Sequence, residues 1–282
     1  MASSSWVLIG DGSLLAGCGD ILLGLGQRIA LVLTREPAIE QWASGHQIRV
    51  ESSGSDYAPL LKDLDFDHLA SIAHLSIIPT EALREVRGLA VNFHDGPLPR
   101  LAGLNVTSWA ILNQEKEHGV TWHTLVERAD AGSILEQRLF EVAADETAFL
   151  LNTKCYAAGL ESFGVLARRV AAGDTAGREQ DLTARNYFSR SARPAAAAVI
   201  DWQVAAEDIS ALVRALDFDS RANPLAQPKL LLGDGLLAIS RSAVIPRSGA
   251  APGTLVATHE DGLQVATRTG DVLVDRFTEL DG

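Results

Sequence analysis

Residues 89–112, LAVNFHDGPLPRLAGLNVTSWAIL, carry a short apolar strand into a polar cluster and then into a helix. The apolar run 89–91 is followed by Asn92, His94 and Asp95, and prolines at 97 and 99 break the strand. Polar groups at the end of a buried strand cost desolvation free energy unless they are paired or used in chemistry. Residues i and i+2 of a strand point to the same face, so Asn92 and His94 project together. This strand end is therefore a candidate site.

Around this strand, short apolar runs alternate with amphipathic segments. The expected strands are residues 6–10, 29–34, 48–51, 70–74, 89–94 and 120–126. The expected helices are residues 13–26, 36–44, 56–63, 80–86 and 105–114. Strands alternating with helices predict an α/β fold with a largely parallel sheet covered on both faces. Such sheets bind ligands at the carboxyl ends of their strands, near a change of strand order, and His94 lies at such an end.

The second half of the chain changes in pattern. Residues 146–172 have an apolar stripe typical of one long helix, with Gly173 just beyond its end. After an Arg- and Ala-rich stretch, a helix is expected to start near the candidate N-cap Asp201. The remainder alternates like antiparallel strands, with turn signals at Asp261-Gly262 and Gly270-Asp271. We predict a catalytic domain at 1–175, a linker across the surface at 176–200 and a small β-rich domain at 201–282.

Composition places the chain among soluble globular proteins, with 282 residues, 47% hydrophobic and 21% charged. No apolar run approaches the roughly 20 residues of a membrane span, which predicts no membrane partner. The start MASSSWVLIGDG has no basic segment before its apolar run and is interpreted as a first strand rather than a signal peptide. Cys18 and Cys155 lie far apart in apolar contexts. Two buried thiols in a reduced cytoplasm are favoured over a structural disulfide.

The charge balance excludes one class of partner. The net charge is −12, and the arginines are concentrated only in residues 178–193. Residues 201–282 hold 7 basic and 12 acidic side chains, a net of −5. Nucleic-acid binding draws most of its affinity from phosphate neutralisation by basic side chains. No nucleic-acid partner is therefore expected.

Two motifs are weighed and set aside. The segment GDGSLLAG after the first strand is similar to a dinucleotide fingerprint, but Leu15 stands where the third glycine should be. A tight turn is favoured over a nicotinamide site. The cysteines and histidines do not fall at metal-ligand spacings, so no metal site is expected.

A carboxylate from elsewhere in the chain could complete the site at His94. Asp130 lies in a Gly-containing loop after the 120–126 strand. A carboxylate that accepts a hydrogen bond from one imidazole nitrogen raises the basicity of the other. An amide donor can stabilise a developing oxyanion. With no evident nucleophile nearby, these groups favour direct attack of an amine or water on a carbonyl. The alternative is a core histidine and a turn aspartate; Trp122 and His123 are interpreted as packing or supporting residues.

Residues 91–137 resemble the 10-formyltetrahydrofolate-dependent formyltransferases. The shared features, in order, are Asn-x-His, Leu-Pro, x-Gly, Trp-Ala-Ile-Leu-Asn, Gly-Val-Thr and Asp-x-Gly. The segment SIAHLSIIPTEAL resembles the loop that lines the folate pocket of that family, and the sequence after Asp201 resembles the entry to its C-terminal domain. The resemblance implies a Rossmann-like catalytic domain followed by an OB-like domain, with 10-formyltetrahydrofolate as co-substrate.

The resemblance also implies roles for particular residues. His94 would accept the proton of the attacking amine, Asn92 would stabilise the oxyanion, and Asp130 would orient His94. The pterin would lie against the 73–78 and 126–130 loops, mainly through backbone groups. The residues implied there are His74, Ser76, Ile77, Ile78, Glu127 and Ala129.

Departures from the family pattern bear on the amine acceptor. The usual His-x-Ser-Leu-Leu-Pro becomes HDGPLP at residues 94–99, so this loop could be shaped for another acceptor. The sequence of residues 94–123 most resembles the formylation domains of nonribosomal peptide synthetase and polyketide assembly lines. The expected partner is then a carrier protein bearing an aminoacyl phosphopantetheine. The alternatives are a nucleotide-linked amino sugar as acceptor, which ERADAG at 127–132 also suits, and a catalytically silent docking module.

Overall fold

The computed structural model describes residues 3–54, 56–233, 235–260 and 262–279. The chain forms two compact units. The first contains the residues up to Gly103, together with Gly119–Phe140 and Lys154–Tyr187. The second contains Leu104–His118, Glu141–Thr153 and the residues from Phe188 onward. Each unit is thus built from several chain segments, and the division of the chain at 175 and 200 stays a prediction.

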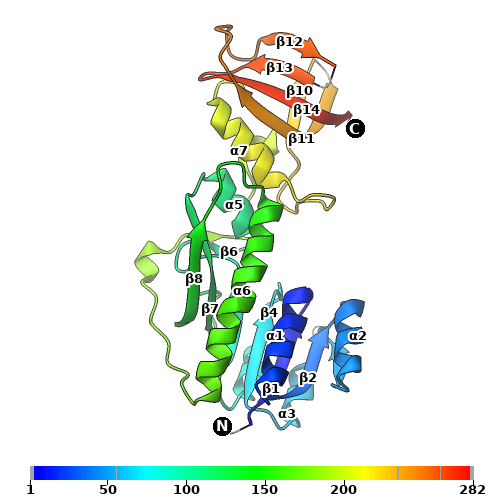
Figure 1. Cartoon of the computed structure of the whole chain (residues 1–282), viewed down its shortest axis with the longest axis vertical. Helices are drawn as coiled ribbons and strands as arrows, with labels where there is room; N and C mark the ends of the chain where they lie inside the picture. The colour runs from blue at the N-terminus through cyan, green and yellow to red at the C-terminus, as the bar shows by residue number, and fades with distance from the viewer. Residues whose placement is uncertain (1–2, 55, 234, 261, 280–282) are drawn as a thin grey trace. The chain divides into compact units, whose positions relative to one another are not determined.

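The first unit is built on a seven-stranded sheet with the strand order β3-β2-β1-β4-β5-β7-β8 (Figure 1). Its strands are β1 (Ser5–Gly10), β2 (Arg28–Thr34), β3 (Val50–Ser52), β4 (His68–Ile72), β5 (Ala90–His94), β7 (Glu117–Thr124) and β8 (Ile134–Glu141). The pairs from β3 to β5 are parallel, whereas β7 pairs with β5 antiparallel. The strand order reverses between β1 and β4, as in nucleotide-binding α/β sheets.

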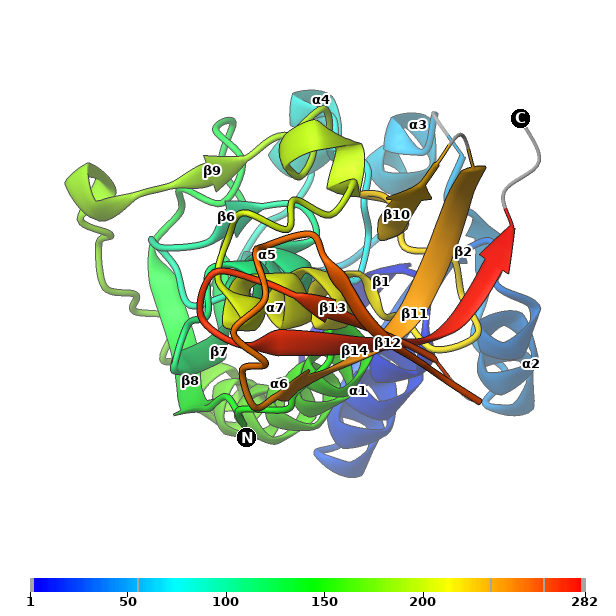
Figure 2. The same cartoon turned by 90° about the horizontal axis from the view of Figure 1, so that it is seen from above.

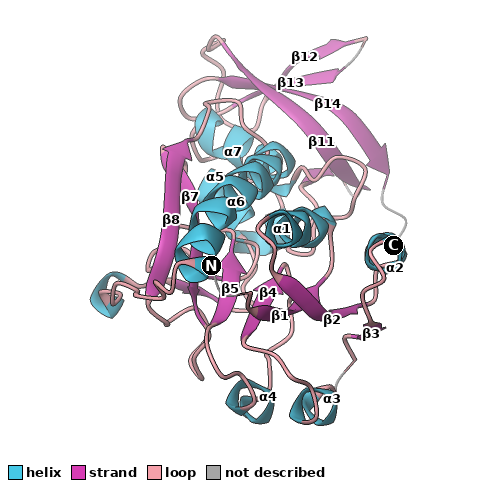
Figure 3. Ribbon diagram, turned by 60° about the horizontal axis from the view of Figure 1, so that its bottom comes forward, coloured by secondary structure: helices cyan, strands magenta, loops and turns pink. Residues whose placement is uncertain are grey.

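Helices cover both faces of this sheet, as the sequence pattern predicts. They are α1 (Ser13–Gly24), α2 (Pro37–Gly45), α3 (Ala58–Lys62), α4 (Thr80–Arg84) and α6 (Ala148–Ala171). Figure 3 shows α1 and α6 on one face and α3 and α4 on the other. Each face of the sheet has its own core cluster. Leu8 of β1 lies in the cluster with α1 and α6, whereas Val7 and Ile9 lie in the cluster with α3 and α4.

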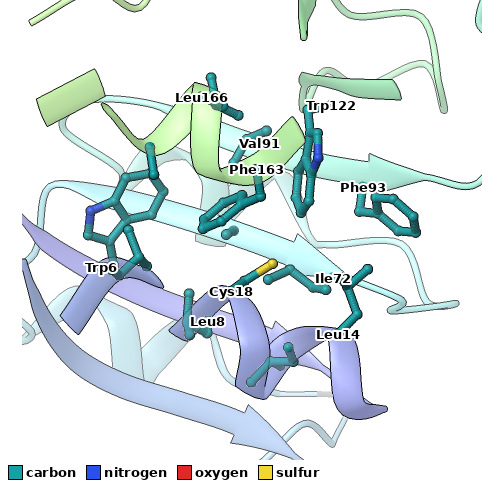
Figure 4. Packing of buried hydrophobic residues seen from close by; sticks show 14 of the residues in the cluster. Trp6, Leu8, Leu14, Cys18, Ile72, Val91, Phe93, Trp122, Phe163 and Leu166 are labelled. Atoms are coloured by element: carbon teal, nitrogen blue, oxygen red, sulfur yellow. The ribbon is translucent and has the colours of Figure 1, made fainter. Parts of the chain in front are cut away.

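The larger core lies between the sheet and α1 with α6. It contains Trp6, Leu8, Cys18, Trp122 and Phe163, each at most 1% exposed (Figure 4). The Trp122 indole N–H donates to Gly159 O and Ser162 Oγ, both at 3.1 Å, so its polar atom is satisfied inside the core. Burying aromatic side chains of this size supplies a large share of the hydrophobic stabilisation of a domain.

The turn after β1 begins at a glycine because the backbone there passes too close to its neighbour for a side chain. A Cβ on Gly10 would lie 1.7 Å from Ile72 O on the neighbouring strand. Only glycine allows β1 and β4 to approach so closely at their carboxyl ends. The N–H of Gly12, which opens α1, is already bonded to the Glu36 carboxylate.

The second unit contains a five-stranded antiparallel sheet packed on a helix. The strand order is β10-β11-β14-β13-β12. The strands are β10 (Lys229–Leu232), β11 (Gly235–Ile245), β12 (Leu255–His259), β13 (Gly262–Ala266) and β14 (Asp271–Glu279). The helix α7 (Ala206–Leu216) packs its Ile209 and Val213 against this sheet. Figure 2 shows the helix beside the strands β13 and β14. A second helix, α5 (Val106–Leu112), also belongs to this unit.

The start of α7 corrects one prediction. Ala205 occupies the N-cap position, whereas Asp201 accepts the backbone N–H of Gln203 at 2.9 Å in a preceding turn. The predicted cap was wrong because the aspartate stabilises this turn instead of the helix. The turn at Gly270-Asp271 joins β13 to β14, whereas Asp261 of the other predicted turn lies outside the described residues.

The fold class is confirmed: a Rossmann-like α/β domain is followed by a small antiparallel β domain. The two cysteines are buried and form no disulfide, as predicted. Among the described residues, no helix is long and apolar enough to cross a membrane.

Candidate active site

The pairing of β5 with β7 places four polar side chains on one face of the sheet. Asn92 lies opposite His123, and His94 lies opposite Thr121. Side chains opposite each other on an antiparallel pair are neighbours on the same face. The intervening residues Phe93 and Trp122 point to the other face, where their rings pack in the core with centroids 5.1 Å apart.

Two carbonyl oxygens fix the hydrogen atoms of Asn92 and His123. Asn92 Nδ2 lies 3.0 Å from Phe93 O and 3.2 Å from His123 Nε2. A carbonyl oxygen can only accept, so the amide nitrogen must face it and donate. His123 Nδ1 lies 3.0 Å from Thr124 O and therefore carries the ring proton, which leaves Nε2 to accept from Asn92. Both amide hydrogens of Asn92 are thus engaged.

The ring of His94 is held by a backbone carbonyl. His94 Nε2 lies 2.7 Å from Leu101 O, which places a proton on Nε2. The other nitrogen, Nδ1, then carries the free lone pair of the neutral ring. Asp130 Oδ1 lies 3.8 Å and Asp95 Oδ1 lies 4.0 Å from Nδ1, both beyond hydrogen-bond distance. The orienting hydrogen bond that the sequence assigns to Asp130 is made by Leu101 O in this structure.

Asp130 lies between the two histidines. Its Oδ1 is 3.5 Å from His123 Nε2, and its Oδ2 accepts the N–H of Gly103 at 2.8 Å. Burial raises the pKa of Asp130, but the positive charge that the His94 and His123 rings carry when protonated, together with the Gly103 N–H, outweighs burial and holds that pKa well below its usual range. The carboxylate is therefore charged wherever the protein is folded near neutral pH.

A second carboxyl group lies beside the histidine. Burial and the nearby Asp130 charge raise the pKa of Asp95, against the lowering effect of the His94 ring. The turn that carries Asp95 is fixed by Thr121, whose hydroxyl donates to Gly96 O at 2.8 Å and accepts the Leu98 N–H at 3.1 Å. A Cβ on Gly96 would lie 2.8 Å from both His94 Nε2 and Leu101 O. Glycine is required there because the histidine ring occupies the space.

This arrangement is suited to proton transfer. A neutral imidazole with a lone pair on Nδ1 and two carboxyl groups about 4 Å away gains a proton with electrostatic support. The structure therefore brings together all three residues of the predicted catalytic set, Asn92, His94 and Asp130.

The residues predicted to line a folate pocket occupy two loops. The first follows β4, which pairs with β5 through Ser71 and Asn92. In this loop Ile78 is buried, whereas Ser76 and Ile77 are exposed, Ile77 at 84%. The second follows β7, and in it Glu127 and Ala129 are exposed. Their contacts with a ligand stay a prediction.

His74, at the start of the first loop, has a polar atom that the described residues leave unsatisfied. Its Nε2 atom is buried and has no hydrogen-bond partner in the described part of the chain. Burial lowers the pKa of His74, an effect that the Asp11 charge opposes and Arg35 reinforces. The buried Tyr57 hydroxyl is likewise unpartnered among the described residues, and the two rings meet edge to face at 6.5 Å.

His123 has the supporting role that the sequence predicts, because it bonds Asn92 and contacts Asp130. Its alternation with Trp122 predicts its face of the strand but not its partner. Sequence reasoning missed two parts of the site. The acceptor Leu101 O is a backbone atom, and no sequence pattern points to it. The contact of Gly96 with the His94 ring is likewise invisible without the turn geometry.

Two family models match the chain. One, described as "Formyl transferase", matches residues 34–163, and the other, described as "Formyl transferase, C-terminal domain", matches residues 194–281. Together they span most of the sequence, including the loop that carries Asp130.

Solved structures show the same fold. An N-formyltransferase from Helicobacter canadensis, in complex with folinic acid and dTDP-3-aminofucose, has a TM-score of 0.76 and 15% identity over 99% of this chain and 100% of its own. A 4-N formyltransferase from Francisella tularensis has a TM-score of 0.67 and 17% identity over 82% of this chain and 93% of its own. HypX from Aquifex aeolicus, in complex with tetrahydrofolic acid, has a TM-score of 0.68 and 18% identity over 99% of this chain and 44% of its own.

Proposed function

This chain is a member of the formyl transferase family, and on that premise we propose that it transfers the formyl group of 10-formyltetrahydrofolate to a primary amine. The observation that carries the proposal is the assembly of His94 with Asn92 and Asp130 at the end of β5. The co-substrate supplies the activated formyl carbon, and the protein supplies the base, the charge and the positioning.

His94 acts as the base in this proposal. Because Nε2 donates to Leu101 O, the proton of the attacking amine goes to Nδ1. The resulting imidazolium faces the Asp130 carboxylate at 3.8 Å, which stabilises its charge. The same proton is then available for the nitrogen that leaves when the bond between the donor and the formyl carbon breaks. A positioned base of this kind contributes about 10²–10⁴-fold to the rate.

Asn92 is proposed to stabilise the negative charge that develops on the formyl oxygen. Both of its amide hydrogens are engaged, with Phe93 O and His123 Nε2. Donation to the formyl oxygen therefore requires the amide to exchange one of these bonds. The bond to His123 is the longer, at 3.2 Å, and is the one we expect to be exchanged.

The proposed folate pocket has features that fit a flat heterocycle. The loop after β4 exposes Leu75 at 72% and Ile77 at 84%, and the loop after β7 exposes Val126 at 45%. Apolar side chains with a few polar groups are typical of small-molecule sites. The Nε2 atom of His74 has no hydrogen-bond partner in the described part of the chain, but it is buried, so a ligand would bond it only after the loop moves. The residues that would hold the folate are therefore proposed to be those of these two loops.

Two acceptors are retained, each on its own observation. A nucleotide-linked amino sugar is supported by the structural relatives, since one is a complex with dTDP-3-aminofucose and another is a 4-N formyltransferase. An aminoacyl group on a carrier protein is supported by the resemblance of residues 94–123 to assembly-line formylation domains. Both present a primary amine to the same base, so the chemistry at His94 does not distinguish them.

The test offers both amines to the protein. The chain is incubated with 10-formyltetrahydrofolate and either a dTDP-linked amino sugar or aminoacyl-loaded carrier proteins, and each acceptor is followed by intact mass. We expect a formyl mass increment on one acceptor and its loss by about 10²–10⁴-fold in His94→Ala. His46→Ala is the matched control, because this histidine lies at the end of α2, is 44% exposed, and contacts Asp20 and the Trp42 ring rather than the site.

The outcomes separate the candidates. Formyl on the sugar or on the carrier identifies the acceptor class. His94→Ala activity within a few-fold of the parent would rule out its role as base. Formyl on neither acceptor, with the folate intact, would favour a silent docking module.

A further inference from the structure

Two residues of the site have a left-handed backbone conformation without being glycine. Leu101, whose carbonyl holds His94, has φ 53°, and Asp130 has φ 53°. This region is disfavoured for residues with a Cβ, and such conformations persist where the surrounding structure over-determines them. The groups that hold these two backbones are therefore part of how the site is built.

One short segment, residues 180–186, reaches both of them; we call it the brace. It lies within the stretch that the sequence predicts to be a linker, and it includes one 3-10 turn, Leu182–Ala184. Three of its side chains hydrogen-bond backbone atoms of the two loops: Gln180, Arg185 and Asn186. The brace therefore hydrogen-bonds backbone groups of the site.

Gln180 holds the loop of Asp130. Its Nε2 donates to Asp130 O at 3.0 Å and to Gly132 O at 2.6 Å. Because both acceptors are carbonyl oxygens, the amide orientation is fixed with the nitrogen toward the loop. Its Oε1 is buried without a partner in the described part of the chain, so those two carbonyls alone set the orientation. Arg185 adds a bond from Nη2 to Ala129 O at 3.0 Å on the preceding residue of the loop.

Asn186 holds the loop of Leu101. Its Oδ1 accepts the Leu101 N–H, and its backbone oxygen accepts the Ala102 N–H at 3.0 Å. The same series of hydrogen bonds continues from Leu101 to the histidine, because His94 Nε2 donates to Leu101 O at 2.7 Å. Asn186 thus fixes both peptide groups that flank Leu101, the first through its side chain and the second through its backbone oxygen, and His94 donates to the carbonyl of the second.

We propose that Asn186 and Gln180 are positioning residues: Asn186 fixes the peptide whose carbonyl sets the His94 tautomer, and Gln180 fixes the loop that presents Asp130. The activity part of this inference rests on the proposed function. The tautomer part does not, because it concerns the resting protein without substrates.

The side-chain chemistry of the brace gives a sharp set of variants. The Asn186 side chain acts as an acceptor, so Asn186→Asp keeps its bond to the Leu101 N–H and Asn186→Ala removes that bond. The bond from the Ala102 N–H to the backbone oxygen of residue 186 is kept in both variants. Gln180 acts as a donor, so the nearly isosteric Gln180→Glu places a carboxylate against two carbonyl oxygens and breaks the interaction. Asp181→Ala is the matched control in the same segment, because among the described residues the Asp181 carboxylate accepts hydrogen bonds from Thr183 within the brace and from neither loop of the site. All these positions are exposed or half-buried, so the variants are expected to fold.

The first measurement is the tautomer of His94, by long-range ¹H–¹⁵N NMR on the full chain near pH 8. We expect the parent, Asn186→Asp and Asp181→Ala to show the Nε2–H form. In Asn186→Ala the ring should become a mixture of the two forms, since Leu101 loses the side-chain bond to its N–H and its carbonyl is held only through the Ala102 N–H. An unchanged Nε2–H tautomer in Asn186→Ala would overturn the proposal for Asn186.

The second measurement is the turnover number with whichever amine proves to be the acceptor. Asn186→Ala and Gln180→Glu should each lose about tenfold in kcat, the size expected for one misplaced hydrogen bond. Asn186→Asp should recover most of this loss, and the KM for the amine should change little in all of them. Equal kcat in Gln180→Glu and the parent would overturn the role of Gln180. Failure of the proposed function would instead appear as no turnover in the parent, with the tautomer result unaffected.

Discussion

Gly96→Ala should disable the site while leaving the fold intact. Gly96 has no positive φ, so its backbone accepts alanine without strain, and any effect arises from the added methyl group. The new Cβ would lie 2.8 Å from His94 Nε2 and 2.8 Å from Leu101 O. Ordinary contacts begin near 3.4 Å, so each of the two atoms must retreat by about 0.6 Å, which is 3.4 minus 2.8.

That movement stretches the hydrogen bond between the ring and the carbonyl. The bond is 2.7 Å long, and if both of its atoms move directly away from the new methyl group it lengthens to about 3.3 Å, just past the usual range, so it is weakened and misaligned. The expected cost in folding free energy is about 1–3 kcal/mol for overpacking. The expected loss in kcat is larger, about 10²-fold, because a catalytic group displaced by a fraction of an ångström no longer meets its proton.

The assay combines kcat from acceptor formylation with a urea midpoint for each variant. Gly45→Ala on α2 is the matched control, since a Cβ there meets nothing within 4 Å and the residue has no positive φ. We expect the control to keep its activity. The reasoning is refuted if Gly96→Ala retains kcat within about threefold of the parent, or if both variants lose activity equally.

Three further perturbations test the electrostatics and the core. The pKa of Asp130 is lower in the folded than in the unfolded chain, so its contribution to stability is present above about pH 4 and is lost as the pH falls through the folded pKa; Asp130→Asn should flatten the acid limb of stability against pH, measured by urea unfolding from pH 2 to 6. Burial raises the pKa of Tyr57 to about 12 from 10, so its contribution is present below pH 10 and is lost as the pH rises toward 12; Tyr57→Phe should unfold less readily than the parent over that range, followed by circular dichroism. Leu8 is fully buried between the sheet and its helices, so Leu8→Ala should cost about 2–5 kcal/mol of unfolding free energy, with a lower urea midpoint and an unchanged slope.

The sequence predicts the frame of the site because that frame depends on local periodicity. The alternation of strands and helices specified the parallel sheet, and the two-residue period of β5 placed Asn92 and His94 on one face. The apolar contexts of Cys18 and Cys155 sufficed to predict buried thiols. These features need no knowledge of which distant segments meet.

The parts that could not be predicted depend on pairing between distant segments. His123 meets Asn92 only because β7 pairs with β5 in one register, which no local pattern specifies. Leu101 O meets His94 because a left-handed residue turns its carbonyl inward, and Asn186 holds it from a stretch that looks like a linker. Asp201 has the chemistry of a helix cap, but the helix begins at Ala206, so the cap prediction failed.

The back-to-back placement of core and polar cluster on β5 and β7 has an evolutionary consequence. Phe93 and Trp122 pack on one face, while Asn92 and His123 meet on the other through the same two backbones. A slip of one residue between these strands would exchange the faces and turn the polar groups into the core. Selection that preserves the packing of Phe93 and Trp122 therefore also preserves the positions of Asn92 and His123. Substitutions that accumulate in this part of the core should change the catalytic rate. A library randomised at these two aromatic positions should lose active members faster than it loses folded ones.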